Sequence, residues 1–400
     1  MKYRVAIVVQ GRFYMFDVAK ALLARGHDVR LFTNYPRWAV ARFGFPPERV
    51  TSYWLHSVLA RSCHFVRDKF HGPYPEAWLH KLFGQWAARQ VSRVRWDAVF
   101  CFSSVSEELI SALKGTLSPS WLFRSSSHIL RQAELLEAEE RRAGVPIDRP
   151  SAWMIAREER EYAGADVIVT LSGFARDTFA GTSHEHKLVM VPLGVDVAHF
   201  RPTADKIEAR RNRILGGAKL RVLFVGTKSY RKGLLELTQI VQTLTDRFEF
   251  RFVGPEEAQA HAHLAALRAH AELVPAIPEA QLPEAYEWGD VFIFPTIEDG
   301  FAAVLTQASA AGLPILATGN CGAPDFIRDG ETGWVLPVRA AESFIERLEW
   351  CDAHRSALAE MATRTAHEFQ PRTWDEVARD FESAIEQRRL RGAELAETAS

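Results

Sequence analysis

Cysteine is scarce in this chain of 400 residues, and long apolar runs are absent. The four cysteines, Cys63, Cys101, Cys321 and Cys351, stand far apart and never in the Cys-x-x-Cys spacing of zinc and redox sites. No apolar stretch approaches the roughly 18 residues that cross a bilayer, and the opening residues lack the pattern of a signal peptide. We therefore expect a cytoplasmic protein, with neither a disulfide scaffold nor a membrane-spanning helix.

Three functional motifs are also missing. The first predicted strand is followed by a single glycine and not by Gly-x-Gly-x-x-Gly, which argues against a nicotinamide dehydrogenase. No Asp-x-Asp precedes a strand end, and His261 and His263 face different sides of a predicted helix, so we expect no metal site. The chain has no nucleic-acid-binding motif, which makes nucleic acid the least favoured partner.

Charge is unevenly distributed along the chain, although the net charge is only −1. Residues 1–100 contain 16 Lys and Arg against 6 Asp and Glu, a balance of +10. Within them, the stretch Arg61–Arg95 mixes cations with aromatic residues such as Phe65, Trp78 and Phe83. Such a face can bind an anionic membrane surface or an acidic acceptor. The alternative is an ordinary solvated surface whose aromatic side chains turn inward.

Strands and helices alternate in both halves of the chain. In the first half, strand Tyr3–Val9, helix Phe13–Ala24 and strand Val29–Phe32 form a βαβ unit, which predicts a parallel sheet. The alternation starts again with strand Leu220–Val225 and helix Leu234–Leu244. Because 400 residues with 47% apolar content can bury two cores, we expect an α/β protein with two Rossmann-like domains.

A linker separates the two predicted domains. The segment Pro192–Pro202 combines glycine and prolines with a loss of helical periodicity. We therefore expect an N-terminal domain over residues 1–195 and a C-terminal domain over residues 203–370. Residues 391–400 are small and polar, and we expect a disordered tail there.

The most informative segment is residues 290–318. An apolar strand is followed by the turn Asp299-Gly300 and then by a predicted helix, Phe301–Ala311. The first N–H groups of a helix lack partners within it and favour an anion, most often phosphate. The groups concerned are those of Phe301, Ala302, Ala303 and Val304.

This segment resembles the donor-site motif of retaining GT-B glycosyltransferases of family four, which is written EGFGxxxLEAxAxGxPV and contains Glu-x7-Glu. Asp299 stands at the first glutamate and Gln307 at the second, in an EDGF…Q variant of the motif. The resemblance implies that Asp299 accepts hydrogen bonds from sugar hydroxyls and that Gln307 contacts ribose hydroxyls. The alternative is that Asp299 only caps the helix and Gln307 is an ordinary solvated helix residue.

A second segment, Gly226–Gly233, follows the first strand of the second half and resembles the family's phosphate-binding loop. Lys232 matches the family's lysine, whereas Thr227 stands where the family has arginine. Arg231 is a candidate for the missing charge. Cations at this place stabilise the charge that grows on a diphosphate leaving group. A solvated cation is the alternative for Lys232, but a cation beside a helix N-terminus is unfavourable unless it binds an anion.

Three further positions carry the resemblance. Gly11 resembles the glycine turn near the reacting carbon, and Arg124–His128 resembles an RxSSHI element whose histidine lies against the donor sugar. Ile277 lies in a segment similar to the one that reads the nucleotide base. For His128 the alternative is a half-buried residue beside a serine that caps the next helix.

The resemblance as a whole implies a GT-B fold, in which two Rossmann-like domains face each other across a cleft and a terminal helix, residues 374–390, returns to the N-terminal domain. The residues it implies for donor binding are Gly11, Thr227, Arg231, Lys232, Ile277, Asp299, Gly300, Phe301, Ala302, Ala303, Val304 and Gln307, and those for catalysis are His128, Lys232 and Asp299.

The function expected from this resemblance is retaining transfer of a sugar from a UDP- or GDP-linked donor to a glycan or lipid-linked acceptor. The process would serve cell-surface polysaccharide or glycoconjugate biosynthesis, without a metal cofactor, with peripheral contact to the inner face of the membrane through the basic N-terminal half. Two alternatives stay open. One is an inverting transferase or epimerase that uses a base such as His128, and the other is a non-catalytic sugar-nucleotide-binding partner.

Overall fold

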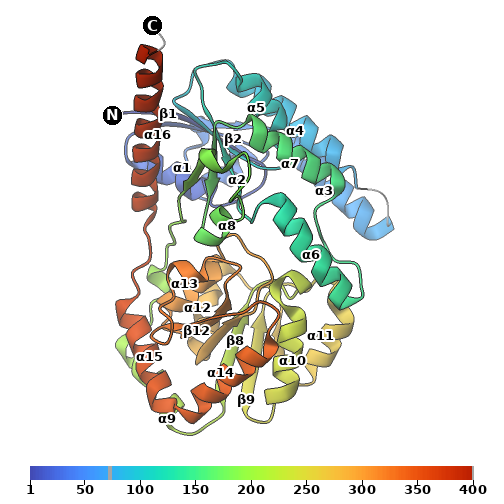
Figure 1. Cartoon of the computed structure of the whole chain (residues 1–400), viewed down its shortest axis with the longest axis vertical. Coiled ribbons are helices and arrows are strands. Elements are labelled where there is room, and N and C mark those ends of the chain that lie inside the picture. Colours follow the sequence, from blue (N-terminus) through green and yellow to red (C-terminus); the bar gives the residue numbers. More distant parts are fainter. Residues whose placement is uncertain (71–73, 399–400) are drawn as a thin grey trace.

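The computed structural model of the chain describes residues 1–70 and 74–398, which form two α/β domains stacked along the long axis (Figure 1). The N-terminal sheet has the order β3-β2-β1-β4-β5-β6-β7, and the C-terminal sheet has the order β10-β9-β8-β11-β12-β13. All strand pairs in both sheets are parallel. Each sheet lies in its own hydrophobic core, as the sequence predicts for two Rossmann-like domains.

The N-terminal strands are β1 (Arg4–Val9), β2 (Asp28–Thr33), β3 (Val50–Ser52), β4 (Ala98–Phe102), β5 (Ser120–Phe123), β6 (Val167–Thr170) and β7 (Leu188–Met190). The helices of this half are α1 (Met15–Ala24), α2 (Arg37–Ala41), α3 (Trp54–Phe70), α4 (Glu76–Val91), α5 (Glu107–Leu113), α6 (Ile129–Ala143), α7 (Ala152–Gly164) and α8 (Gly173–Asp177). Every residue of β4, β5 and β6 is buried, because helices cover both faces of a parallel sheet.

The C-terminal strands are β8 (Leu220–Val225), β9 (Phe248–Val253), β10 (Glu272–Val274), β11 (Val291–Phe294), β12 (Ile315–Thr318) and β13 (Gly333–Leu336). The helices are α9 (Ala204–Leu215), α10 (Leu234–Leu244), α11 (His261–Arg268), α12 (Leu282–Trp288), α13 (Ala303–Ala310), α14 (Ala341–Ala353) and α15 (Arg355–Glu368). In the sheet, Phe292 of β11 is opposite Leu223 of β8 on one side and Ile315 of β12 on the other. The loops that follow β8 and β11 therefore emerge side by side.

The last helix, α16 (Trp374–Thr398), runs back along the N-terminal domain beside α1 (Figure 1). Val377, Phe381 and Ile385 are buried in the N-terminal core, as expected for a returning helix. The expectation of disorder from residue 391 onwards is wrong up to Thr398, which is helical. The segment is rich in Ala, Glu, Leu and Arg, which all favour the helix, and residues 399–400 lie outside the described residues.

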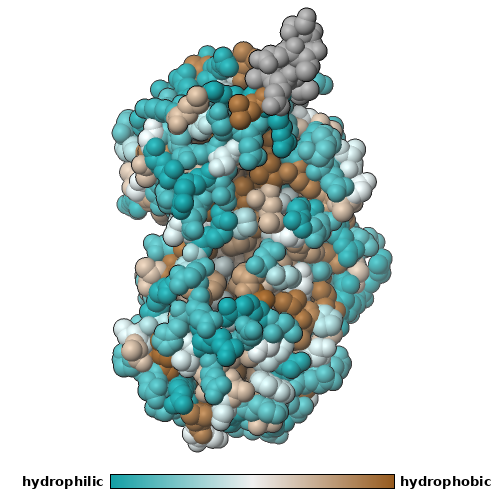
Figure 2. Space-filling model, turned by 60° about the vertical axis from the view of Figure 1, so that its left-hand side comes forward, coloured by the Kyte–Doolittle hydropathy of each residue, from teal (hydrophilic) through white to brown (hydrophobic). Residues whose placement is uncertain are grey.

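Helix α6 connects the two domains. It starts at the junction and extends toward the C-terminal domain (Figure 1), where Leu136 and, just beyond the helix, Ile147 join the C-terminal hydrophobic core. The core of one domain therefore includes residues from the sequence range expected for the other. In a space-filling view the outline of the molecule narrows where the domains meet (Figure 2). Within the described residues, none of the helices has both the length and the hydropathy to cross a bilayer.

Candidate functional site

The loops at the carboxyl ends of both sheets meet at the domain junction. From the N-terminal side, Ser127 follows β5 and Ser172 follows β6; from the C-terminal side, Glu298 and Gly300 follow β11. The Ser127 N–H donates to Glu298 Oε1 at 2.8 Å, and the Ser172 hydroxyl donates to the Gly300 carbonyl at 2.6 Å. Ligands of open α/β sheets bind at such carboxyl edges. The junction is therefore the candidate ligand-binding site.

Lys232 and Asp299 form an ion pair at this junction, with their side chains only 14% and 20% exposed. The Lys232 ammonium donates to Asp299 Oδ2. Burial lowers the pKa of Lys232 from its ordinary value. Burial alone would raise the pKa of Asp299, but the nearby Lys232 and Arg231 outweigh it and hold that pKa below its usual range. The structure thus brings together two of the three residues expected to act in catalysis.

A second ion pair lies directly beside the first. Arg231 Nε donates to Glu298 Oε2 at 2.9 Å, so two consecutive cations of one loop pair with two consecutive carboxylates of the other. The Glu298 side chain is 0% exposed, whereas Arg231 is partly exposed. Arg231 Nη2 also donates to Ser126 Oγ at 3.1 Å, across the domain junction. We call the pairs Arg231–Glu298 and Lys232–Asp299 the charge ladder.

The backbone of the first loop makes this ladder possible. Lys232 ends a short 3-10 turn, and Gly233 follows with φ of +81°. A Cβ atom at Gly233 would lie 2.0 Å from the carbonyl oxygen of Pro295, so only glycine allows the two loops to approach so closely. Lys228, another cation of this loop, is fully buried and donates to the carbonyls of Gly254 and Val274 at 2.6 and 2.7 Å. Thr227, at the family's arginine position, is exposed.

The predicted start of the helix after Gly300 needs a correction. Helix α13 begins at Ala303, two residues later than expected, and Ala302 before it has left-handed backbone angles with φ of +61°. The N–H groups of Phe301 and Ala302 donate to Asp299 Oδ1 at 3.0 and 2.8 Å. An aspartate side chain readily bonds the backbone two residues ahead. Of the four N–H groups expected to face an anion, two are thus bound to Asp299, and Ala303 and Val304 form the start of the helix.

Two glycines of the predicted site have roles in backbone geometry. A Cβ atom at Gly300 would lie 1.9 Å from the carbonyl oxygen of Ser125, so only glycine fits at this position, where the two domains touch. Gly11 adopts φ of +88° in the turn after β1, and its N–H donates to Asn34 Oδ1 at 2.8 Å. Both positions lie on loops at the carboxyl ends of strands, as the resemblance implies.

Gln307 lies on α13 and is half-buried. Its Oε1 accepts a hydrogen bond of 2.9 Å from the hydroxyl of Tyr286, a residue of α12 that is 0% exposed. The amide is therefore not simply a solvated helix residue. Ile277, expected near the nucleotide base, follows β10 and is also half-buried against the C-terminal core.

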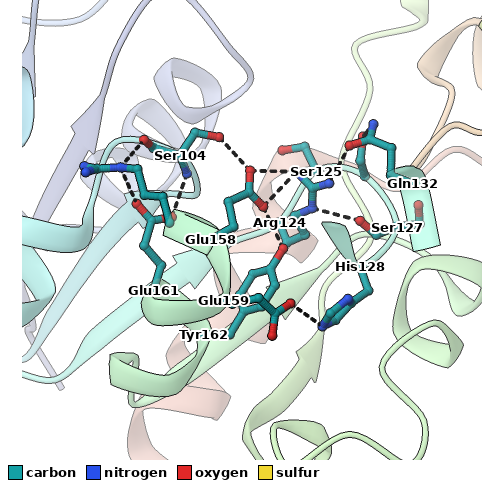
Figure 3. A network of polar contacts seen from close by, with 12 residues as sticks. Ser104, Arg124, Ser125, Ser127, His128, Gln132, Glu158, Glu159, Glu161 and Tyr162 are labelled. Atoms are coloured by element: carbon teal, nitrogen blue, oxygen red, sulfur yellow. Dashed lines mark hydrogen bonds and ion pairs between the residues drawn. The ribbon is translucent and has the colours of Figure 1, made fainter. Parts of the chain in front are cut away.

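His128, to which the resemblance assigns a part in catalysis, lies in a buried environment. Its ring is buried, 3% exposed, between Tyr162 and Phe179. Nε2 lies 3.3 Å from Glu159 (Figure 3). Nδ1 accepts from the N–H of Leu130, so that His128 itself caps α6. Burial, together with the charge of Arg124, lowers the pKa of His128 to about 4. The part in catalysis expected for His128 stays a prediction.

Sequence reasoning missed the residues that connect the domains. Gln132 Nε2 donates to Glu298 Oε2 at 3.1 Å. Arg124 in turn donates to Gln132, Ser127 and Glu158 (Figure 3). The only signal in the sequence was the RxSSHI element. From it His128 was predicted as a site residue, whereas Arg124 and Ser127 were not. Within residues 1–70 and 74–398, no group of three or more His, Cys, Asp or Glu residues is arranged to hold a metal ion.

Comparison with known proteins agrees with this architecture. Residues 205–368 match the family model of glycosyl transferases group 1. The chain is 26% identical over 411 residues to a D-inositol 3-phosphate glycosyltransferase of Actinosynnema mirum, a match that covers 94% of this chain and 91% of that protein. It is 27% identical over 194 residues to a GDP-mannose-dependent alpha-(1-6)-phosphatidylinositol monomannoside mannosyltransferase of Mycobacterium tuberculosis, covering 45% of this chain and 50% of the relative.

A solved structure shares the fold over nearly the whole length. The crystal structure of HepE from Anabaena, in complex with UDP and glucose, superimposes with a TM-score of 0.64 at 12% identity, covering 96% of this chain and 100% of the other. Such low identity establishes the fold alone. The chain is a glycosyltransferase with a GT-B fold, and its residues 205–368 form a glycosyl transferases group 1 domain.

Proposed function

We propose that the protein transfers a sugar from a nucleotide-diphosphate donor to a glycan or lipid-linked acceptor with retention of anomeric configuration. The observation that carries the proposal is the buried Lys232–Asp299 pair beside the start of α13, at the carboxyl edges of two facing sheets. A cation held there can stabilise the charge that develops on a departing diphosphate. The relatives' names, which include a GDP-mannose-dependent enzyme, and the UDP complex of HepE support the same donor class.

Retention is favoured by the state of the carboxylates at the site. Glu298 and Asp299 are both held in ion pairs and accept further backbone hydrogen bonds, so neither is a free nucleophile for a covalent intermediate. We therefore propose front-face attack, in which the leaving phosphate takes the proton of the acceptor hydroxyl. Inversion with His128 as base is disfavoured, because that ring is buried and its pKa is lowered to about 4.

The acceptor side is proposed from an exposed face of α3. Trp54, Val58 and Phe65 are 50–59% exposed and recur at spacings that place them on one side of the helix, and the exposed Arg61 lies beside them. Exposed apolar residues flanked by cations suit an anionic membrane or a lipid-linked acceptor. The sequence prediction of a basic-aromatic face holds only in part, since Phe83 is fully buried whereas Trp78 is half-exposed. A role in cell-surface polysaccharide or glycoconjugate biosynthesis, at the inner face of the membrane and without a metal cofactor, belongs to the same proposal.

The donor test is release of nucleoside diphosphate from a panel of UDP- and GDP-linked sugars, followed by NMR of the anomeric configuration of the product. We expect one base and one sugar to give turnover and a retained configuration. An inverted product would remove the retaining assignment. Failure of every donor to turn over, while UDP or GDP still binds, would favour a binding protein.

The acceptor side is tested by sedimentation with vesicles of phosphatidylglycerol, compared with vesicles of phosphatidylcholine alone. We expect binding to the anionic vesicles that weakens in a Trp54→Ser, Phe65→Ser variant. Equal binding of the variant and the unchanged protein would exclude this face of α3.

A further inference from the structure

Glu298 is an unusual carboxylate, because it is completely buried and is bound from both domains at once. Oε1 accepts from the N–H and the hydroxyl of Ser127 at 2.8 and 3.0 Å, and Oε2 accepts from Gln132 and Arg231 at 3.1 and 2.9 Å. Three of these four donors belong to the N-terminal half and one to the C-terminal loop. A buried carboxylate is stable only when it is paired and hydrogen-bonded, so Glu298 is satisfied only while the domains are together.

The donors from the N-terminal half are themselves held in place. Arg124 is buried and bonds the Ser127 carbonyl at 2.8 Å, Gln132 Oε1 at 2.7 Å and Glu158 at 3.2 Å. Figure 3 shows this guanidinium lying between Glu158 on one side and Ser127 on the other. A chain of hydrogen bonds thus runs from Glu158 through Arg124 and Gln132 to Glu298, and ends at Arg231. Such a fully bonded network fixes its members in one arrangement.

The end of the network is the guanidinium of Arg231. Its Nε is bound by Glu298 and its Nη2 by Ser126, whereas in the part of the chain that the structure describes Nη1 has no hydrogen-bond partner. A planar guanidinium that is held by two of its nitrogens has only one direction left for the third. Arg231 is next in sequence to Lys232, whose ammonium pairs with Asp299.

We propose that Glu298 is a positioning residue: it fixes the Arg231 guanidinium so that Nη1 meets the diphosphate of the donor, and it does so only when the domains are closed. This rests on the proposed donor class. Opening the domains takes Ser127 and Gln132 away from Glu298 and Ser126 away from Arg231, so both the carboxylate and the guanidinium lose their fixed orientation. Domain closure and assembly of the diphosphate site are therefore a single event.

A matched control is available at the same junction. Glu139 of α6 is also fully buried and pairs with Arg142 at 2.8 Å and with Arg339, from the C-terminal domain, at 3.0 Å. It therefore resembles Glu298 in burial and in joining the domains, but it has no contact with Arg231 or Lys232 among the described residues. A Glu139→Gln variant reports the effect of weakening the domain contact alone.

The experiment uses the full chain and inorganic pyrophosphate as the probe of the diphosphate site, with binding measured by calorimetry for the unchanged protein, Glu298→Gln, Arg231→Gln and the double variant. We expect Glu298→Gln to weaken pyrophosphate binding at least fivefold and Glu139→Gln to leave it within twofold. In the double variant the loss should be close to that of Arg231→Gln alone, because Glu298 acts through Arg231. Small-angle scattering should show a larger radius of gyration for Glu298→Gln than for the unchanged protein.

Three results would overturn the proposal: full pyrophosphate affinity in Glu298→Gln, losses that simply add in the double variant, or no pyrophosphate binding by the unchanged protein. Should Glu298→Gln lose its circular dichroism spectrum, Ser127→Ala takes its place, since it removes one of the four donors. That variant should lower affinity by a smaller factor, and unchanged affinity would again refute the idea. The readout needs no sugar transfer, so it is separate from the donor test above.

Discussion

The Lys232–Asp299 pair makes two separable predictions, one for stability and one for turnover. In Lys232→Ala the carboxylate of Asp299 loses its cation while it stays largely buried, with the N–H groups of Phe301 and Ala302 as its remaining bonds. Breaking a fully buried pair costs roughly 3–5 kcal/mol. Since these side chains are 14% and 20% exposed, we expect a smaller loss of unfolding free energy, about 2 kcal/mol.

Turnover should fall for a different reason. If Lys232 meets the charge on the leaving diphosphate, its removal should lower kcat at least about tenfold, the scale of one lost charge contact. Adding Asp299→Asn to Lys232→Ala removes the unpaired carboxylate, so the double variant should regain most of the lost stability but none of the turnover. Urea unfolding and diphosphate release measure the two quantities on the same samples.

A suitable control is Lys219→Ala, because Lys219 is an exposed cation that bonds only the Thr245 carbonyl, at 3.3 Å, among the described residues. We expect it to change neither quantity appreciably. Unchanged turnover in Lys232→Ala would remove this lysine from the mechanism. A double variant no more stable than the single one would show that the unpaired Asp299 carboxylate does not destabilise the protein. Water would then solvate this carboxylate better than its exposed fraction implies.

Three other substitutions test single features of the site. Gly300→Ala should separate the domains at Ser125, because the added carbon would lie 1.9 Å from a backbone oxygen; we expect a loss of about 1–3 kcal/mol in urea unfolding, and unchanged stability would contradict the contact. Gln307→Glu should keep or improve donor binding in calorimetry, since a carboxylate still accepts from Tyr286; complete loss of binding would give Gln307 another role. His128→Gln should make the free energy of unfolding fall less steeply as the pH is lowered. The pKa of His128 is lowered to about 4, so the unfolded chain takes up a proton that the folded chain does not, and stability is present above pH 6.5 and lost as pH falls toward 4. Between pH 7 and pH 5 the variant should lose about 2 kcal/mol less of its unfolding free energy than the unchanged protein. An equally steep loss in both would contradict the burial of His128.

Much of the fold could be predicted because its signals are local. Buried strands such as Val291–Phe294 and Leu220–Val225 are short apolar runs between turns, and parallel order follows from their alternation with helices. The region 35–95 carried no such pattern, and the structure fills its described part mainly with α2, α3 and α4. There, exposed apolar residues such as Trp54 and Phe65 lie on one side of α3, so an apolar position does not always mark the buried face.

The candidate site was predictable only in its parts. Lys232 and Asp299 could be named from motifs, but their pairing joins positions 67 residues apart and depends on how two loops pack. Glu298 could not be predicted, because its donors Ser127 and Gln132 are distant in sequence and only the fold brings them to it. The burial of His128 could not be predicted either, since the residues that bury it, Tyr162 and Phe179, are distant in sequence.

The ladder also indicates which cation of the loop is available to a donor. Lys228 is committed to two backbone carbonyls. Arg231 pairs with Glu298, whose side chain is 0% exposed, so its release would leave a carboxylate without a cation and without water. Asp299 differs, because its side chain is 20% exposed, and its Oδ1 keeps two backbone N–H bonds even if Oδ2 gives up Lys232.

An incoming diphosphate can therefore displace Asp299 from Lys232 at a smaller cost than it can displace Glu298 from Arg231. On the proposed function, we expect Lys232 to exchange a carboxylate for a phosphate and Arg231 to offer a fixed Nη1 beside it. Since Thr227 adds no charge and Lys228 is bound to two carbonyls, we expect the charge that this loop offers a diphosphate to come from Lys232 and Arg231.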